Sequence, residues 1–213
     1  GYTVYTTSYT PNGGTATPLT VRVPTGVSVQ DVTQGTSNAD TSAGTSGSDV
    51  IKTGEGNDTI IASAGADLIE TGAGNDVVTY DTADWHVFGG TGDDTLVINT
   101  YTSNGLASGT PMADLTTRAG TQVKGFEVID LTASGSQAVK LDETAVMALS
   151  DTGRITVKGT AADQLSLYGG WAYVGVDSDA SGAIYKVLQK GDAYVTVADA
   201  IKLHINNELG GTV

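Results

Sequence analysis

The chain has 213 residues with 39% hydrophobic content, which is enough for one main folded unit with a subdivision. Its 24 acidic and 10 basic residues give a formal net charge of −14, which argues against nucleic acids and anionic membrane surfaces as partners and favours cations. Cysteine is absent, so a disulfide framework and a thiolate metal site are excluded as well.

The N-terminal segment predicts a β-hairpin. Runs rich in β-forming residues cover Tyr2–Thr10 and Thr17–Val23, and the turn sequence Pro11–Gly14 separates them. The segment has neither the charged nor the apolar region of a secretory signal, and no apolar run in the chain approaches the ~18 residues of a membrane span. We therefore expect a piece of a longer protein, with no membrane insertion.

Residues Gly26–Gly44 are mostly Thr, Ser, Gly, Asn and Asp, with almost no large apolar residue after Val32. Such a composition is typical of a connector rather than of a core element. We expect three regions: an N-terminal hairpin with a connector at 1–40, a repeat region at 41–99, and a β-rich region at 100–213.

A nine-residue repeat dominates the second region. Its aspartates fall nine residues apart, with one unit skipped where Trp85 takes the place; they are Asp49, Asp58, Asp67, Asp76 and Asp94. The five aspartates and Trp85 together mark six positions at intervals of nine residues. An aliphatic residue follows two positions after each of them, at Ile51, Ile60, Ile69, Val78, Val87 and Leu96. In all units but the skipped one, a glycine stands two positions before the aspartate. Asp outnumbers Glu by 19 to 5 in the chain, which suits tight turns that use a short carboxylate.

Each unit fits one turn and one short strand, because glycines permit positive φ and a lone aliphatic residue fills one inward position. Units must stack to bury that residue, and successive units then alternate between two edges of a flattened solenoid with about 18 residues per coil. Asp49 would lie over Asp67 on one edge, while Asp58, Asp76 and Asp94 would form a column on the other.

Carboxylates stacked at strand spacing, ~4.8 Å, repel one another. A hard divalent cation between adjacent turns removes this repulsion, and backbone carbonyls of the Gly-rich turns can complete a shell of about six to eight oxygens. Calcium fits such a site better than magnesium, which keeps its waters and a strict octahedron.

Three units carry the pattern most clearly: Thr53–Ile61, Thr71–Thr79 and Gly89–Val97. They resemble the repeats-in-toxin (RTX) nonapeptide, which forms a calcium-binding β-roll. The resemblance implies that aspartate carboxylates and turn carbonyls hold the metal, with about three to five calcium ions expected. The implied residues are Asp40, Asp49, Asp58, Asp67, Asp76, Asp94, Gly47, Gly54, Gly56, Gly65, Gly72, Gly74, Gly90 and Gly92.

A second resemblance covers the C-terminal half. Gly125–Thr132, Gln137–Asp142, Arg154–Lys158 and Gly169–Trp171 are similar to the C-terminal region of giant RTX adhesins of Gram-negative bacteria, which are exported by type I secretion. This resemblance implies a secreted or cell-surface location, and the neighbouring domains of a longer adhesin as partners.

The repeat is irregular in two places. The unit Tyr80–Phe88 lacks both the aspartate and the glycines, so Asp81 or Asp84 is the candidate to replace the missing ligand. Asp40 keeps the nine-residue phase, but Ser42 stands where the aliphatic residue belongs, so Asp40 is expected only to cap an end site.

In the third region, alternating apolar residues predict half-buried strands. These cover Val123–Leu131, Ala138–Leu141, Ile155–Val157, Leu165–Tyr168, Trp171–Val176, Ala183–Leu188 and Tyr194–Ile205. One helix is expected at Glu143–Leu149, with Asp142 as its N-cap and Gly153 soon after its end. The predicted fold is thus all-β: a short calcium-binding parallel β-roll packed against a β-rich sandwich or solenoid-like cap, with at most one or two short helices.

Several other residues have two interpretations. The segment Asp177–Gly182 is similar to the start of an EF-hand loop, in which Asp177 and Asp179 would bind metal, but the twelfth position is Leu188, so a hairpin turn is favoured. Trp85 either contacts a ligand or a neighbouring domain, or packs against the core. The aromatic residues Tyr168, Trp171 and Tyr173 either form a platform for a sugar or pair within the sheet.

The leading hypothesis for function is a non-catalytic adhesin module in which calcium acts as a folding switch outside the cell. The alternative is a ligand-recognition domain of the adhesin, which binds a peptide or carbohydrate on host or neighbouring cells. An enzyme is not expected, because the chain has no HExxH zinc motif, no phosphate-binding loop and no G-x-S-x-G sequence.

Overall fold

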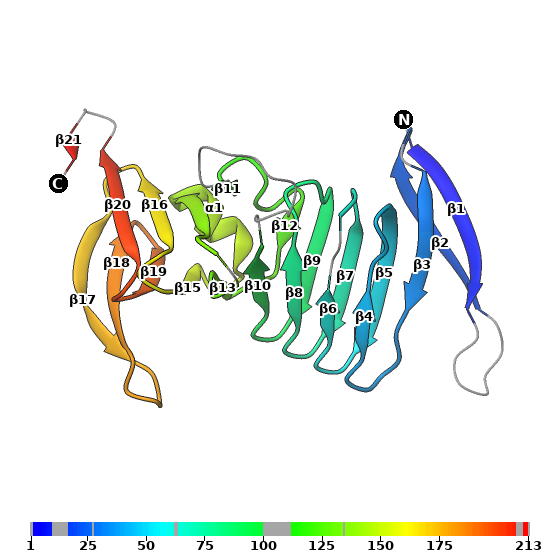
Figure 1. Ribbon diagram of the computed structural model, residues 1–213, viewed down its shortest axis with the longest axis horizontal. Coiled ribbons are helices and arrows are strands. Elements are labelled where there is room, and N and C mark those ends of the chain that lie inside the picture. The colour runs from blue at the N-terminus through cyan, green and yellow to red at the C-terminus, as the bar shows by residue number, and fades with distance from the viewer. Residues whose placement is uncertain are drawn as a thin grey trace.

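The computed structural model describes residues 2–9, 17–26, 28–61, 64–99, 112–133, 135–207 and 211–212. These residues form twenty-one strands and one helix, so the predicted all-β class is confirmed. Strands stack side by side along the long axis of the molecule, with the N-terminal hairpin near one end and β17, β20 and β21 at the other (Figure 1).

The N-terminal hairpin consists of β1 (Tyr2–Tyr9) and β2 (Thr17–Pro24), which pair in antiparallel fashion as predicted. The expected turn at Pro11–Gly14 lies outside the described residues. Val21 and Val23 of β2 are buried in a small apolar cluster with Val50 and Leu68. The hairpin is therefore anchored on the first coils of the repeat region.

The repeat region is a parallel roll of two facing sheets. One sheet contains β3 (Val29–Gln34), β5 (Ser48–Glu55), β7 (Leu68–Ala73), β9 (His86–Thr91) and β12 (Val123–Lys124). The other contains β4 (Thr41–Ala43), β6 (Thr59–Ile61), β8 (Val77–Tyr80), β10 (Thr95–Ile98) and β13 (Val128–Asp130). Ile51 pairs with Ile69, and Ile60 pairs with Val78, so one coil takes two repeats. The six aliphatic residues of the repeat are at most 1% exposed.

The segment predicted as a connector forms the first coil instead. Strands β3 and β4 lie within Gly26–Gly44 and pair in parallel with β5 and β6. Ladder hydrogen bonds need only backbone groups, so a segment of small polar residues can join the sheet beside an apolar coil. Ser42 occupies the inward place of an aliphatic residue and is buried.

The C-terminal half continues with two sheets, whose last strands pair in antiparallel instead of parallel fashion. Strands β15 (Arg154–Lys158), β19 (Ala193–Ala198), β18 (Ile184–Lys190) and β17 (Ala172–Ser178) extend the second sheet of the roll to nine strands. Opposite them lies a five-stranded sheet of β11 (Met112–Asp114), β14 (Ala138–Asp142), β16 (Gln164–Tyr168), β20 (Lys202–Asn207) and β21 (Gly211–Thr212). One apolar core runs from the roll into this half.

Two predicted strands of this half are each divided into two. The predicted strand Val123–Leu131 breaks at Gly125, whose φ is +72°, and the predicted strand Tyr194–Ile205 breaks at the turn between β19 and β20. In both places the chain crosses from one sheet to the other. Periodicity alone does not reveal such a corner, because both sides of it carry apolar residues.

The predicted helix is present as α1 (Glu143–Leu149). Its N-cap is Asp142, whose side chain accepts a hydrogen bond from the Ala145 amide at 2.7 Å. At seven residues, α1 is far too short to cross a membrane, and the described residues contain no other helix. It packs against β12, β14, β15 and β19, where the roll meets the C-terminal half.

Candidate metal sites

Two rows of turns connect the sheets of the roll. We call the turns 35–40, 53–58, 71–76 and 89–94 the first edge; they follow one another along the lower side of the roll in Figure 1. The turns ending at Asp49, Asp67 and Trp85 form the second edge. Each turn begins at the end of one strand and delivers its last residue to the start of the next, so equivalent residues of successive coils are stacked.

The aspartates of each edge form a hydrogen-bonded column. On the first edge the backbone amides of Asp40, Asp58 and Asp76 each donate to the Oδ1 atom of the aspartate one coil further on, at 2.7–2.8 Å. On the second edge the Asp49 amide donates to Oδ1 of Asp67 at 2.8 Å. The predicted arrangement in two columns is therefore what the structure shows.

The second carboxylate oxygen of four aspartates has no hydrogen-bond partner. These oxygens are the Oδ2 atoms of Asp58, Asp67, Asp76 and Asp94, and all four are buried. Burying a charged oxygen without a partner costs free energy, which a bound cation would remove. The turns that end at these four aspartates thus each present one unsatisfied anionic oxygen.

The pKa values of these carboxyl groups reflect the same cost. Burial raises the pKa of Asp67 to about 6, with a further contribution from the charge of Asp49. Burial also raises the pKa of Asp94 to about 7 and that of Asp76 above its usual value. The fold therefore holds negative charge where, without a cation, the charged form is disfavoured.

Glycine carbonyls face the narrow space between successive turns. A Cβ atom on Gly72 or Gly90 would lie 2.0 or 1.9 Å from the carbonyl oxygen of the equivalent glycine one coil earlier, Gly54 or Gly72. Gly74, Gly92 and Gly65 are placed in the same way against Gly56, Gly74 and Gly47. All of these glycines except Gly47 have positive φ. Only glycine therefore allows successive turns to approach one another so closely.

This donor set fits calcium. Unpaired carboxylate oxygens and backbone carbonyls are the hard oxygen ligands that calcium takes. In the described ranges no three His, Asp or Glu side chains come close enough together to hold a metal by themselves. Carbonyl oxygens must therefore supply part of any coordination shell here.

The first aspartate of each column is satisfied without a metal. Oδ2 of Asp49 accepts hydrogen bonds from both the amide and the hydroxyl of Thr45, and Oδ2 of Asp40 accepts the same two bonds from Thr36. In the C-terminal half Thr160 caps Asp163 in the same way. At the start of each column, threonine donors thus satisfy the carboxylate oxygen that a cation would bind elsewhere in the column. This is the role expected of a residue that caps the end of the column.

Replacing Thr45 by valine is expected to lower the free energy of unfolding by about 1 kcal/mol, because the buried carboxylate of Asp49 loses the hydroxyl donor. Urea unfolding at saturating calcium measures the change, and the number of bound ions should stay the same. Thr41→Val serves as a control, since the Thr41 side chain is exposed on β4. An equal loss in both variants would contradict the capping role.

In the irregular unit Asp84 joins the second column. Its Oδ1 accepts the Asp67 amide at 3.3 Å and its Oδ2 accepts the Asp81 amide at 2.9 Å. Burial raises the pKa of Asp84 to about 8. Asp81 instead accepts from the Ala83 amide within its own turn. Trp85 is partly buried against the cluster of the N-terminal hairpin, which accounts for its presence at the aspartate place.

The other candidate residues lie away from the columns. Asp179 accepts hydrogen bonds from Ser181, Ala183 and Tyr185, and it closes the exposed hairpin between β17 and β18. Asp177 lies on the same hairpin and accepts the amide of Ser178. These bonds are those of the favoured hairpin turn.

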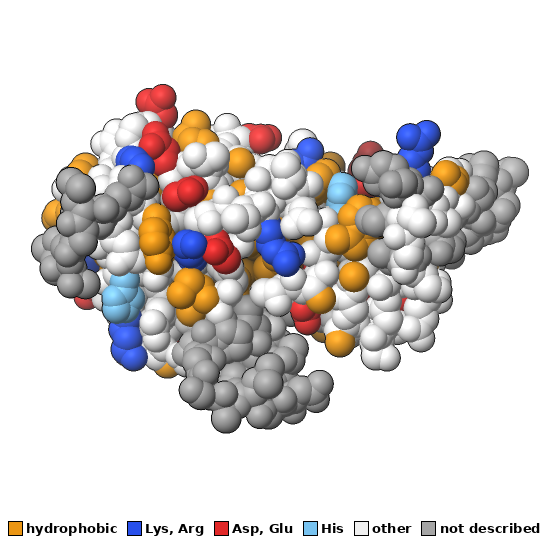
Figure 2. All heavy atoms as spheres, turned by 90° about the horizontal axis from the view of Figure 1, so that it is seen from above, with side chains coloured by type: hydrophobic (Ala, Val, Ile, Leu, Met, Phe, Trp, Pro, Cys, Tyr) orange, Lys and Arg blue, Asp and Glu red, His pale blue; other side chains and the backbone are white. Residues whose placement is uncertain are grey.

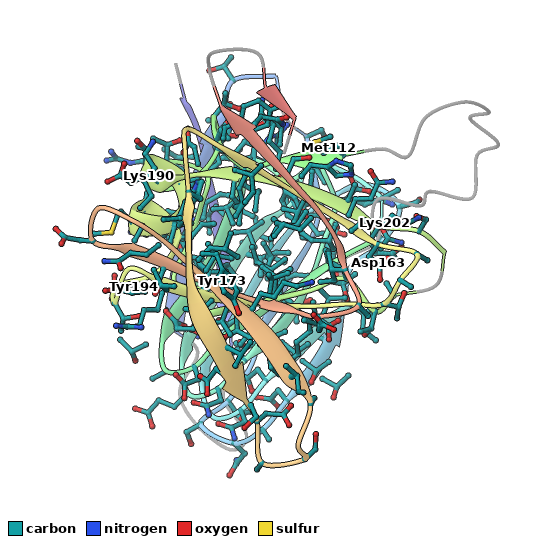
Figure 3. All side chains as sticks on the ribbon, turned by 90° about the vertical axis from the view of Figure 1, so that its left-hand side faces the viewer. Met112, Asp163, Tyr173, Lys190, Tyr194 and Lys202 are labelled. Atoms are coloured by element: carbon teal, nitrogen blue, oxygen red, sulfur yellow. The ribbon has the colours of Figure 1, made fainter. Side chains whose placement is uncertain are left out.

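The three aromatic residues of the C-terminal half do not form one platform. Trp171 is only 6% exposed and belongs to the core, whereas Tyr173 is 61% exposed on β17. Figure 3 shows Tyr173 at the C-terminal end of the stack of strands. Tyr168 lies under the ammonium group of Lys140, 4.7 Å from its ring centre. A surface that combines all three rings is therefore absent.

Glu127, which the nine-residue interval did not single out, continues the first column. Its Oε2 accepts the Asp94 amide at 3.0 Å, as the aspartates do in the roll. Burial raises the pKa of Glu127, and the charges of Asp93 and Asp151 add to this effect. The signal was present: Gly125 precedes Glu127 by two positions and Ile129 follows it by two, the offsets of the repeat.

Comparison with protein families agrees with this geometry. Residues 34–69, 43–78 and 86–97 match the family described as RTX calcium-binding nonapeptide repeat (4 copies). No curated protein matches the chain. The chain therefore carries RTX repeats, a calcium-binding sequence family that is typical of secreted proteins.

Proposed function

We propose that this chain is a non-catalytic module of a secreted bacterial adhesin that folds when it meets extracellular calcium and serves adhesion at the cell surface. The observation that carries the proposal is the set of four buried Oδ2 atoms without partners, at Asp58, Asp67, Asp76 and Asp94. The resemblance of the C-terminal half to adhesins and the elongated stack of coils support the adhesin part.

Calcium would act through the folding equilibrium. Without the ion, stacked buried carboxylates oppose the folded state, and with the ion the binding free energy becomes folding free energy. Extracellular calcium modules bind at ~10⁻⁴ to 10⁻³ M, so the roll would remain unfolded in a calcium-poor cytosol and fold after export. The unfolded chain is also the form that an export channel can pass.

The proposed ligands are the four unpaired carboxylate oxygens, each with carbonyl oxygens of the adjoining turns. One ion per unpaired oxygen gives four ions, within the expected range of about three to five. Asp40 and Asp49, which threonines cap, would stabilise the first coil without holding an ion of their own.

Asp76→Asn tests the proposal. The amide keeps an oxygen that can accept the Asp58 amide, but the charged oxygen is lost. We expect at least one ion fewer by equilibrium dialysis with metal analysis. Folding should require at least about 10-fold more calcium, because losing a direct ligand costs no less than losing an outer-shell partner. Asp177→Asn, on the exposed hairpin, removes the same charge as a control. A wild-type chain that binds no calcium at millimolar concentration would refute the proposed function.

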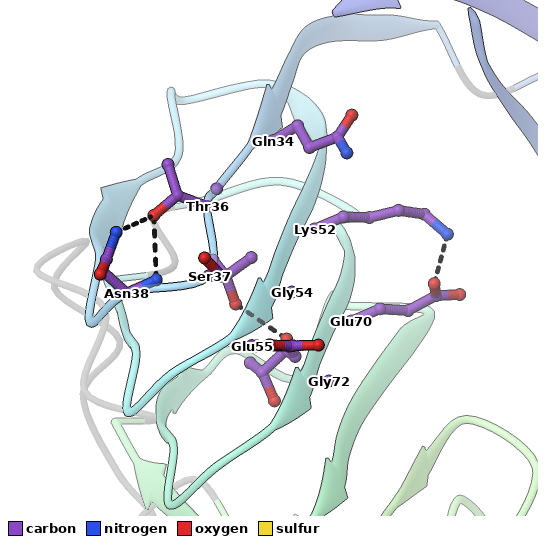
Figure 4. Close-up of a pocket in the computed structure, with 12 residues that line it drawn as sticks. Gln34, Thr36, Ser37, Asn38, Lys52, Gly54, Glu55, Glu70 and Gly72 are labelled. Carbon is purple, nitrogen blue, oxygen red and sulfur yellow. Dashed lines mark hydrogen bonds and ion pairs between the residues drawn. The ribbon is translucent and has the colours of Figure 1, made fainter. Parts of the chain in front are cut away.

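Ligand recognition is the second candidate, and one cavity favours it. A hollow of about 700 Å³ lies beside the first turn of the first edge, lined by residues that include Gln34, Asn38, Lys52 and Glu70 (Figure 4). Lys52 and Glu70 form an ion pair at its rim. Polar side chains and glycines line it, although most of its exposed surface is carbon, and Trp85, Tyr168, Trp171 and Tyr173 do not contribute to it.

A peptide or carbohydrate with several hydrogen-bonding groups would suit such a lining. Glycan and peptide arrays in calcium, with Lys52→Ala compared to the exposed Lys158→Ala, test this second candidate. Saturable binding that only Lys52→Ala removes would support it.

On the face shown in Figure 2 basic side chains lie apart from one another and form no continuous patch, in keeping with the net charge of −14.

A further inference from the structure

The last turn of the first edge, 89–94, is followed by a turn that is not part of the repeats. The next coil is supplied by Gly125–Glu127. Glu127 lies 33 residues beyond Asp94 in the chain, and its Oε2 atom accepts a hydrogen bond from the Asp94 amide. The matched repeat ends at residue 97. The column of carboxylates therefore crosses from the roll into the C-terminal half.

An unsatisfied oxygen lies at this crossing. Asp94 is 0% exposed, and its Oδ2 has no partner. A Cβ atom on Gly89 would lie 2.9 Å from that Oδ2 and 1.9 Å from the Gly125 carbonyl oxygen. Both oxygens therefore border the same small space beside Gly89, which only the lack of a side chain keeps open.

The other wall of this space belongs to the C-terminal half. The amides of Gly125 and Phe126 donate to the Leu149 carbonyl at the end of α1, at 2.7 and 2.9 Å. The Glu127 carbonyl accepts the Thr156 amide of β15 at 2.8 Å. Phe126 is fully buried in the main core. The segment Gly125–Glu127 is thus held in place by α1 and β15.

We propose that a calcium ion binds between Asp94 Oδ2, the Gly125 carbonyl and the Glu127 carboxylate, and joins the roll to the C-terminal half. The inference rests on the proposed calcium function, but its ligands include two residues outside the repeats. Two carboxylates and carbonyl oxygens are a normal calcium donor set. With this ion, folding of the C-terminal half depends on calcium although that half carries no repeat.

Glu127→Gln is the test variant, because the amide can still accept the Asp94 hydrogen bond while the charged ligand is lost. Glu55→Gln is the matched control, since Glu55 is exposed on a turn of the same edge. Each is made in a Trp85→Phe background, which leaves Trp171 of the two tryptophans as a reporter buried in the C-terminal half. Equilibrium dialysis with metal analysis counts the ions, and Trp171 fluorescence follows a calcium titration.

We expect Glu127→Gln to bind one ion fewer at ~1 mM calcium. The Trp171 transition should move to at least about 10-fold higher calcium, because losing a direct ligand costs no less than losing an outer-shell partner. The control should keep both values. If Glu127→Gln fails to fold at that concentration, calcium raised by the same factor should restore the Trp171 signal by mass action. Failure of this rescue would overturn the inference.

The outcomes separate the inference from the proposed function. If the wild-type chain binds calcium and Asp76→Asn loses an ion, the proposed function stands. An unchanged ion count and Trp171 transition in Glu127→Gln would then refute only the joining site. If the wild-type chain binds no calcium, both proposals fail.

Discussion

Complete removal of calcium is expected to abolish the far-ultraviolet circular dichroism signal of the parallel roll and to unfold the region from β3 to β10. The physical reason is the stack of buried carboxylates: four have an oxygen without a partner, and burial raises the pKa of Asp67, Asp76 and Asp94. Each such group disfavours the folded state until a cation neutralises it.

The measurement is a titration of the chain with a calcium chelator, followed by circular dichroism and by hydrogen exchange of the strand amides. Magnesium at equal concentration is the control, and it should fail to restore the signal because it demands a smaller, strictly octahedral site. A spectrum that stays unchanged after metal analysis shows full calcium removal would contradict the folding switch.

Gly74→Ala is expected to damage the roll severely by adding a single methyl group on the first edge. Gly74 has a φ of +133°, and an added Cβ atom would lie 2.0 Å from the Gly56 carbonyl oxygen and 2.6 Å from its carbonyl carbon. Backbone atoms cannot move aside as a flexible side chain can, so adjacent turns must separate. We expect a loss of about 3 kcal/mol or more in the free energy of unfolding, with weaker calcium binding.

Gly182→Ala provides the matched control for this variant. Gly182 also has positive φ, +84°, but an added Cβ atom would meet nothing within 4 Å. Only the backbone strain of about 1–2 kcal/mol remains there. Urea unfolding of both variants in saturating calcium separates strain from close approach, and equal losses would show that turn spacing is not what Gly74 protects.

The roll could be predicted from sequence because its signal is strictly periodic. A nine-residue interval fixes which residues stack, so the pairing of Ile51 with Ile69 follows from the positions alone. The first coil was missed because β3 and β4 join the sheet mainly through backbone bonds, and Ser42 takes the inward place without an apolar signal.

The site could be predicted in part. The two columns follow from the period, but the sequence does not show which carboxylates are already satisfied. Thr45 caps Asp49 through a four-residue turn, a contact that depends on turn geometry. Asp84 takes the place of the missing aspartate in the second column, although it lies one residue before the position that the nine-residue interval predicts. Glu127 takes the next place in the first column after a long insertion in the chain. Each of these depends on the path of the chain in space, which a repeat interval does not encode.

The continuous nine-stranded sheet has a mechanical consequence. Tension along the long axis acts across the strands, so it opens one ladder of hydrogen bonds at a time instead of shearing many together. The ladders that β13 makes with β10 and with β15 contain three residue pairs each, as do those that β6 makes with β4 and with β8, whereas β10 pairs with β8 over four. Under load, the seam between the roll and the C-terminal half is thus a weak point of this sheet, and an ionic cross-link beside it would set the force at which the module yields.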